Sequence, residues 1–352
     1  MDKIIIAADI HCGVRGKLDD CLWALKTIRQ YASDNSIDVV VILGDLFHDR
    51  VNLNIKVISG VADFLDEAKY KYNQEWLLFP GNHDMFMRHS WNVNSLRPIK
   101  RLVTLIDDVA LVRIEDRKFR IVPFIQKEEV FSRVLDRMEE KISGDEVLLT
   151  HAGISGAKYN SCFLMQHWGI IDFTNTNFSK VFAGHFHCMQ EYGNVHIPGS
   201  PIPFRFDEGM VDHGFFEFDL NTNQTKFVNI NVGRELVGGS LPPDYVTIPI
   251  NDLSDVDVSN NNIRVFLDQE NKSRDELDRI RKDLMDRGAI KVAWMKTKEE
   301  DREVPSGTAS LEPSSLLEKF IEFDKPKGLN KQLLLSLNKQ IMEEAFDANP
   351  NE

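Results

Sequence analysis

The sequence predicts an α/β fold, and two features of the first half of the chain support this prediction. Five short runs of apolar residues, largely β-branched or aromatic, recur there, and segments with helical spacing follow the first two. Continuous apolar runs of this length are typical of strands that are buried on both faces of a sheet. Polar side chains follow each run closely, and the carboxyl ends of strands are where α/β sheets bind their ligands.

The polar residues after the five runs make up one set of candidate metal ligands. In chain order, the runs and the residues that follow them are Ile4–Ile6 with Asp9 and His11; Val39–Leu43 with Gly44 and Asp45; Trp76–Phe79 with Asn82, His83 and Asp84; Val147–Leu149 with His151; and Val181–Ala183 with Gly184, His185 and His187. Seven of these side chains are expected to converge on metal: Asp9, His11, Asp45, Asn82, His151, His185 and His187.

The chemistry of these seven side chains favours a binuclear metal site. None is a thiolate, which argues against a closed structural zinc site. Four imidazoles fit magnesium or calcium poorly, whereas mixed nitrogen and oxygen ligands suit manganese, iron or zinc. Seven ligands exceed the needs of one tetrahedral ion, and one carboxylate can bridge two ions, roughly 3.5–4 Å apart, in sites that hydrolyse phosphate esters. The other interpretation, a satisfied polar group at each strand end, would have to hold for all seven residues at once.

The same residues carry a family resemblance. Five ordered motifs, Asp9-x-His11, Gly44-Asp45, Gly81-Asn82-His83-Asp84, His151 and Gly184-His185-Phe186-His187, resemble those of the calcineurin-like metallophosphoesterases. The resemblance implies a central β-sandwich flanked by helices, in four layers α/β/β/α. It also implies that Asp45 bridges two divalent ions, most often Mn²⁺. Asp9, His11 and His187 would complete one site, and Asn82, His151 and His185 the other.

The segment Asp45-Leu46-Phe47-His48 narrows the resemblance. It is similar to the SbcD-like nucleases of DNA double-strand-break repair and their phage relatives, and Ile197–Pro201 and Gly214–Phe218 also resemble that group. The resemblance implies a DNA exonuclease and endonuclease subunit that works with an SMC-like ATPase in recombination and repair. A phosphatase or small-molecule phosphodiesterase on the same fold is the alternative. A non-catalytic scaffold that docks the ATPase is a third possibility.

Four further residues are predicted to act around the metals. The resemblance implies that His83 faces the leaving oxygen as a general acid or transition-state stabiliser, and that Asp84 orients its imidazole. It also implies that His48 bears on how a duplex end is handled. Arg15, in the loop after His11, is a candidate for binding a DNA phosphate, although an ordinary exposed arginine is an equal alternative. Among the other histidines, His167, His196 and His213 match no motif and are not included among the ligands, and His196 and His213 are expected to be structural.

Residues 1–240 are predicted to form the nuclease domain. Helical spacing is found in Asp19–Tyr31, Val51–Tyr72 and Glu128–Lys141, and strand-like segments in Leu102–Leu111 and Phe119–Phe124. Trp91 is expected to pack rather than to stack on a base.

A segment rich in Gly and Pro, Gly233–Pro243, marks the predicted boundary with a small α/β module over residues 241–297. Strands are expected at Asn262–Leu267 and Ile290–Met295. Between them, the capping box Ser273–Glu276 opens a helix that runs to about Arg287. The module resembles the capping domain of the repair nucleases, which helps to shape the DNA groove.

The C-terminal part is predicted to be a linker over 298–312, a helical segment over 313–346 and a tail over 347–352. An apolar helical stripe in the helical segment suits helix-in-groove binding, and its position resembles the ATPase-docking segment of these nucleases. A hairpin that packs back on the domain is the alternative. A homodimer is expected from the resemblance alone.

Charge, apolar content and cysteines limit the class of protein and its location. The formal net charge of −13 argues against a protein that coats nucleic acid, but not against a nuclease, because bound cations offset acidic ligands. The sequence shows no signal peptide and no apolar run as long as a membrane span, and its four cysteines include no CxxC pair. A cytoplasmic location, in the host if the chain is phage-encoded, is therefore expected, with no membrane association.

Overall fold

The computed structural model describes residues 2–87, 89–142, 144–158, 170–173, 176–267 and 272–296. The described residues up to Met295 belong to one compact unit. The predicted linker (298–312), docking segment (313–346) and tail (347–352) lie outside the described residues, as do His167 and Cys162. Within the described part, no helix combines the length and apolarity needed to cross a membrane.

The first of two six-stranded sheets contains the first three predicted strands. Its order is β16-β15-β1-β2-β3-β6, made of β1 (Lys3–Ala7), β2 (Val39–Ile42), β3 (Glu75–Leu78), β6 (Thr104–Leu105), β15 (Gly214–Asp219) and β16 (Thr225–Asn229). Strands β1, β2, β3 and β6 are parallel, and β15 runs antiparallel to β1. Their carboxyl ends therefore lie at one edge of the sheet.

The second six-stranded sheet contains the last two predicted strands. Its order is β13-β14-β12-β9-β8-β7, made of β7 (Ala110–Ile114), β8 (Arg117–Val122), β9 (Val147–His151), β12 (Lys180–Gly184), β13 (Gln190–Tyr192) and β14 (Val195–Ile197). Strands β8, β9, β12 and β14 are parallel, with β7 and β13 antiparallel at the two edges. All five predicted strands are thus confirmed, each as an inner, parallel strand of its sheet.

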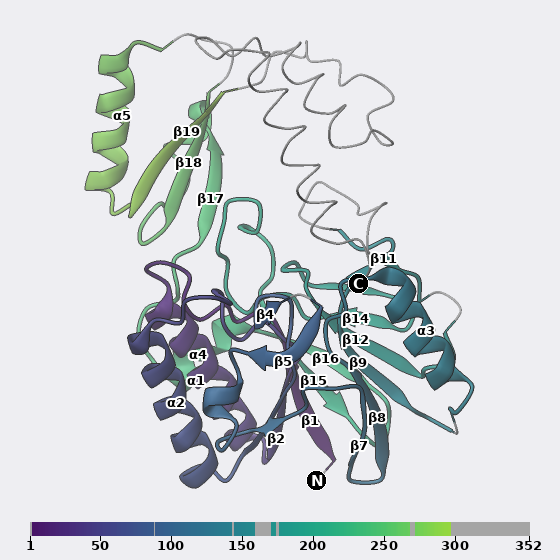
Figure 1. The fold of residues 1–352 in the computed structure, drawn as a ribbon. Coiled ribbons are helices and arrows are strands. Elements are labelled where there is room, and N and C mark those ends of the chain that lie inside the picture. The colour runs from purple at the N-terminus through teal and green to yellow at the C-terminus, as the bar shows by residue number, and fades with distance from the viewer. Residues whose placement is uncertain are drawn as a thin grey trace, which may run out of the picture. The chain divides into compact units, whose positions relative to one another are not determined.

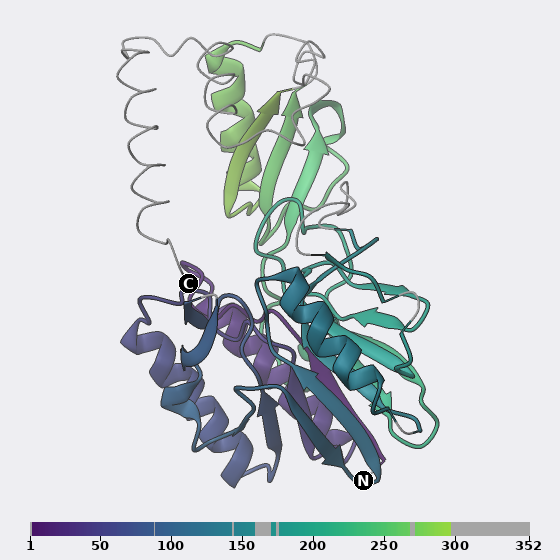
Figure 2. The same cartoon turned by 45° about the vertical axis from the view of Figure 1, so that its right-hand side comes forward.

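Alternation of side chains along the strands builds three apolar layers. In β1, Ile4 and Ile6 join Phe182 and Phe218 between the two sheets, whereas Ile5 packs under the helices of the first sheet. Those helices are α1 (Leu18–Asp34) and α2 (Ile55–Tyr70); α3 (Glu128–Glu139) covers the outer face of the second sheet. Figures 1 and 2 show these helices and the two sheets from two directions. The predicted four-layer α/β/β/α fold is confirmed.

Two predicted element boundaries need correction. The predicted strand Leu102–Leu111 is two strands, β6 and β7, that belong to different sheets. Asp107 and Asp108 interrupt the run, and the Asp108 side chain accepts a hydrogen bond from the Val109 backbone. Helix α2 begins at Ile55 rather than at Val51, because Asn54 caps it by accepting from the Lys56 backbone N–H at 2.8 Å.

The remaining elements of the first 240 residues are short. They are β4 (Met85–Met87), β5 (Ser90–Asn94), β10 (Gly153–Ile154), β11 (Ile170–Ile171), α4 (Gly233–Leu236) and the 3₁₀ turns Arg97–Ile99 and Ile230–Val232. Strands β4 and β5 form a hairpin directly after the Gly81–Asp84 motif. Trp91 in β5 is partly buried and donates its indole N–H to the Phe124 carbonyl at 2.8 Å, so it packs, as predicted.

Residues 245–296 contain a three-stranded sheet with a helix. The order is β17-β18-β19, made of β17 (Tyr245–Pro249), β18 (Asn262–Leu267) and β19 (Lys291–Lys296), with α5 (Arg274–Asp286) between β18 and β19 and a 3₁₀ turn at Ile250–Asp252. The capping box of Ser273 and Glu276 is present. An apolar cluster of its own, which includes Ile263, Val265 and Leu284, fills the space under α5. Strand β17 was not predicted.

Candidate metal centre

The seven predicted ligands lie together at the carboxyl ends of β1, β2, β3, β9 and β12. Most of these side chains are buried, with Asp9 and His151 at 0% exposure. The loops that carry them are tied to one another by backbone hydrogen bonds. His11 N donates to Asp45 O at 3.0 Å, and Cys12 N donates to Leu46 O at 2.8 Å. The first two strands thus continue to pair beyond their ends and hold their polar residues in register.

Asp9, His11 and His187 form the first group of donors. Their ligand atoms lie within 4.8 Å of one another. The Nε2 atoms of His11 and His187 are 3.0 Å apart. The Nδ1 of His187 donates to a carboxylate oxygen of Glu208 at 2.8 Å, which leaves the Nε2 lone pair of a neutral ring directed at His11. Two imidazole nitrogens therefore face each other across a gap that suits a shared cation.

Asn82, His151 and His185 form the second group. The Asn82 side-chain oxygen lies 3.0 Å from His151 Nε2 and 2.9 Å from His185 Nδ1. His151 donates its Nδ1–H to the Leu43 carbonyl at 2.7 Å, so its Nε2 is the nitrogen that faces the centre. Asp45 stands between the groups, because its Oδ2 is 3.4 Å from His151 Nε2 and 3.8 Å from His11 Nε2.

Backbone strain is concentrated at this centre. Asp9, His11, Asp45 and His185 adopt φ values of 53°, 50°, 53° and 104°. Residues other than glycine rarely occupy this left-handed region, at a cost of about 1–3 kcal/mol each, and such residues cluster at functional sites. The strain turns these side chains out of the strand direction and toward one point.

Two motif glycines allow the close approach of the loops. A Cβ atom at Gly44, whose φ is 84°, would lie 2.6 Å from His151 Nδ1. At Gly81, a Cβ atom would lie too close to Asp45 Oδ1 for two atoms that are not bonded. Only glycine leaves room here for the strand ends to meet.

The donor set fits divalent cations. Neighbouring ligand atoms lie about 3 Å apart around a cation at metal–ligand distances of about 2.1 Å, and the pairs above are separated by 2.9 and 3.0 Å. Two nitrogens, or a nitrogen and an amide oxygen, at this distance would repel unless a proton or a cation lies between them. No thiolate takes part, which agrees with a borderline or hard metal ion.

The electrostatics of the side chains at the centre also favour a cation there. Burial raises the pKa of Asp9 to about 6 and lowers the pKa of His185 to about 3. Burial also opposes charge on Asp45 and His151, but their mutual attraction outweighs it. The pKa of Asp45 is therefore held well below its usual range, and the pKa of His151 is raised to about 9.

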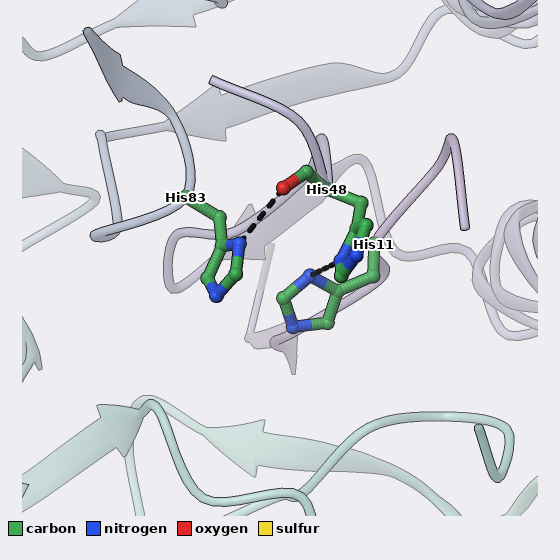
Figure 3. Close-up of side chains that lie close together, drawn as sticks. All are labelled: His11, His48 and His83. Carbon is green, nitrogen blue, oxygen red and sulfur yellow. Dashed lines mark hydrogen bonds between the residues drawn. The ribbon is translucent and has the colours of Figure 1, made fainter. Parts of the chain in front are cut away.

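Two of the predicted catalytic residues, His48 and His83, lie beside the donor His11 (Figure 3). His83 and His48 stack with ring centroids 5.2 Å apart, and His48 Nδ1 lies 3.4 Å from His11 Nδ1. Burial, together with His83, lowers the pKa of His48. The backbone N–H of His83 donates to Asp45 Oδ1 at 2.8 Å. Ligand atoms of His11, His48 and His83 also lie within 4.8 Å of one another.

Asp84 does not contact the His83 imidazole in the way that was predicted. His83 donates its Nδ1–H to the His48 carbonyl at 2.8 Å. The buried Asp84 carboxylate instead accepts from the backbone N–H groups of Phe47 and Gly81, both at 3.1 Å, and from the Ser95 hydroxyl at 3.0 Å. Asp84 therefore fixes the loops that carry Asp45, His48 and His83 through their backbone.

A cavity of about 330 Å³ opens onto the centre. It is lined by His11, Val14, Asp45, His48, Asn82, His83, His185, His187, Phe204 and Arg205. Arg15 is exposed in the neighbouring turn and is not part of this lining, so the structure does not bring it to the centre. A larger cavity of about 590 Å³, near Arg234 and Asp244, contains none of the seven donors.

Sequence reasoning missed Arg205 and Glu208. Both belong to the irregular segment between β14 and β15, which has no periodicity to indicate its position. The one available indication was their nearness to the family-like segment Ile197–Pro201. His213 and His196 are structural, as expected. The ring of His213 bridges two backbone carbonyls at 2.8 Å, and His196 Nε2 contacts Lys180 Nζ at 2.8 Å.

Comparison with known proteins agrees with this geometry. Residues 2–189, more than half of the chain, match the family model described as Calcineurin-like phosphoesterase. The chain is 24% identical over 242 residues to Exonuclease subunit 1 of Enterobacteria phage T4, an alignment that covers 65% of this chain and 68% of the phage protein.

Solved structures also resemble the chain. GAP50 of Plasmodium, described as the anchor in the inner membrane complex, is 14% identical with a TM-score of 0.44, covering 66% of this chain and 85% of its own. A dimetal phosphatase from Danio rerio is 12% identical with a TM-score of 0.39, covering 65% of this chain and 96% of its own.

Proposed function

The chain belongs to the calcineurin-like phosphoesterase family, and from this premise we propose that it is a metal-dependent nuclease that hydrolyses the phosphodiester bonds of DNA. The observation that supports hydrolysis most directly is the meeting of Asp9, His11 and His187 with Asn82, His151 and His185 on either side of Asp45. These are donors for two divalent cations, most often Mn²⁺ in this family. When bound, such cations lower the pKa of water and neutralise charge on the phosphate.

The residues of the chain have separate tasks in this proposal. Asp9, His11 and His187 would hold one cation, Asn82, His151 and His185 would hold the other, and Asp45 would be shared between them. His83 lines the cavity, and because its Nδ1–H is bound to the His48 carbonyl, its Nε2 is the atom that can carry a proton to the leaving oxygen. His48 supports both rings, since its carbonyl holds His83 and its Nδ1 lies against His11. Asp84 keeps the loops in place.

The assignment to DNA draws on the phage relative and on His48. The relative is named an exonuclease subunit, at 24% identity. His48 lies in the cavity wall, where its ring contacts both the proposed ligand His11 and the proposed acid His83. We accordingly propose a role in DNA recombination and double-strand-break repair. Residues 1–240 would form the nuclease domain, and 241–297 a capping domain that shapes the DNA groove.

A partner is part of the same proposal. The word subunit in the relative's name indicates that the relative works within a complex. By analogy, residues 313–346 would dock an SMC-like coiled-coil ATPase, and the chain would pair with a second copy of itself.

A two-substrate assay tests the proposed function. Purified wild-type chain, a His83→Ala variant and a His89→Ala control would be incubated with Mn²⁺ and either linear duplex DNA or a small phosphomonoester. His89 is an exposed histidine on the same segment and is absent from the cavity lining. We expect the wild type and the control to degrade DNA, and His83→Ala to be slower by about 10²–10⁴-fold, because a proton donor is lost.

The assay also separates the alternatives. Hydrolysis of the phosphomonoester alone would retain the metal chemistry and make the nuclease assignment wrong, in favour of a phosphatase. Unchanged DNA degradation by His83→Ala would remove His83 from catalysis.

A further inference from the structure

We propose, on the basis of the proposed nuclease function, that Glu208 is a positioning residue for the metal centre and that Arg205, held by the same carboxylate, binds a non-scissile phosphate of the DNA. Neither residue belongs to the motifs that identify the family. Both lie in the irregular segment between β14 and β15, which folds back against His187.

Glu208 is a hub of hydrogen bonds. Its side chain is buried, with 1% of the residue exposed, and its Oε1 accepts from His187 Nδ1 at 2.8 Å. Oε1 also accepts from Nε and Nη2 of Arg205, each at 2.9 Å, and Oε2 accepts from the Phe204 backbone N–H at 2.8 Å. A buried carboxylate with this many donors is held firmly in one position.

The contact with His187 determines which nitrogen faces the centre. Because Nδ1–H is donated to Glu208, the neutral ring presents its Nε2 lone pair to the gap shared with His11, 3.0 Å away. Carboxylates that hold the far nitrogen of a metal-binding histidine fix its tautomer and orientation in this way. Glu208 thus prepares His187 to accept a cation.

The surrounding backbone holds Glu208 against His187. The ring of His213 lies 2.8 Å from the carbonyl oxygens of both Ser200 and Glu208. Ser200 in turn donates its backbone N–H to the His187 carbonyl at 3.0 Å. At Gly199, whose φ is 74°, a Cβ atom would lie 2.6 Å from that same carbonyl. The segment that carries Glu208 is therefore attached to the His187 loop at two places.

Arg205 adds positive charge to the cavity wall. Its side chain is 52% exposed, and it is the only Arg or Lys among the described residues that line the cavity. The planar guanidinium suits phosphate oxygens, and Glu208 fixes its direction in advance. Because the cations would neutralise the scissile phosphate, a half-exposed arginine at the rim suits the neighbouring phosphate of a polynucleotide.

The test combines three variants with two substrates. The variants are Glu208→Gln, Arg205→Ala and the control Asp207→Asn, which removes a carboxylate 3.7 Å from Arg205 and leaves the Glu208 carboxylate in place. Mn²⁺ affinity would be measured by calorimetry without DNA. KM and kcat would be measured for duplex DNA and for bis(4-nitrophenyl) phosphate, a diester with a single phosphate.

We expect Glu208→Gln to lower Mn²⁺ affinity by about 10–100-fold. Arg205→Ala should leave Mn²⁺ affinity unchanged and raise KM for DNA about tenfold, the effect of one charge-assisted hydrogen bond, with little change on the small diester. Asp207→Asn should match the wild type throughout. Wild-type Mn²⁺ affinity in folded Glu208→Gln would overturn the positioning role. An unchanged KM for DNA in Arg205→Ala, or an equal loss on both substrates, would overturn the phosphate role.

A measurement on the wild type tests the role of Glu208 even if the Glu208→Gln variant fails to fold. Long-range proton–nitrogen NMR of the metal-free wild type, with His187 assigned from a His187→Gln variant, should show the Nδ1–H tautomer. The Nε2–H tautomer would contradict the role of Glu208. Metal affinity and the His187 tautomer are both measured without DNA. These results therefore remain interpretable if the chain does not cleave DNA. Absence of cleavage would count against the proposed function and not against the role of Glu208.

Discussion

Glu217, in strand β15, is a charged residue whose contribution to stability depends on pH. It is largely buried, and its two oxygens accept hydrogen bonds from Lys3 Nζ and the Tyr31 hydroxyl, both at 2.8 Å. Burial alone would raise its pKa, but these partners hold the pKa of Glu217 below its usual range. A carboxyl whose pKa is lowered by folding adds stability above its unfolded pKa and loses it as the pH falls through the folded pKa.

Glu217→Gln should therefore lower the free energy of unfolding at pH 7, because two hydrogen bonds to a charged group are weakened. The Lys3 side chain is partly exposed, so solvent screens its attraction and limits the loss to about 1–2 kcal/mol. Urea denaturation at several pH values measures this difference. It should shrink as the pH falls below the usual glutamate value of 4.5. Glu235→Gln, an exposed position in α4, is the control and should show no comparable loss. A difference that stays constant with pH would contradict the account.

Among individual site residues, the sequence identified those that belong to motifs. It missed those that reach the centre only through folded loops. Asp45 and His151 follow buried strands directly, so their meeting could be expected. Glu208 lies 21 residues after His187 along the chain, and only the folded loop brings the two together. The expected contact between Asp84 and the His83 ring was wrong because neighbouring residues in a tight turn point in different directions.

Elements with a clear period were predicted well. Strand β18 has the predicted bounds, and α5 begins at Arg274, directly after Ser273, the first residue of the predicted capping box. Predictions failed where two elements share one apolar run, as in Leu102–Leu111, or where a strand borders a boundary segment. Strand β17 begins at Tyr245, two residues after the predicted boundary segment ends at Pro243, and no strand was predicted there. Local pattern does not reveal when a chain changes sheets.

The segment 313–346 lies beyond the described residues, and we predict that it docks the proposed ATPase. Its apolar stripe after a polar linker suits docking on a coiled coil. Removing residues 313–352 should abolish co-elution with the proposed ATPase in gel filtration and leave basal nuclease activity unchanged. Removing only residues 347–352 is the control and should preserve co-elution. Retained association of the shorter chain would refute the docking assignment.

For the molecule as a whole, two mixed sheets, whose inner strands include parallel ones, bring distant motifs to one place. The sequence indicated that five strands end in ligands, but it could not indicate that three belong to one sheet and two to the other. The apolar layer between the sheets, with Phe182 and Phe218 at 0% exposure, aligns their carboxyl ends. Residues from Asp9 to His187 can therefore form one centre, with Asp45 in its middle.

The central claim is that this centre binds two cations bridged by Asp45, and a Mn²⁺ titration by calorimetry tests it most directly. The wild type and an Asp38→Ala control, which changes an exposed carboxylate just before the amino end of the same strand, should each bind two ions. Asp45→Ala should lose two-ion binding, because both groups of donors share its carboxylate. Two ions bound by Asp45→Ala at unchanged affinity would contradict the account.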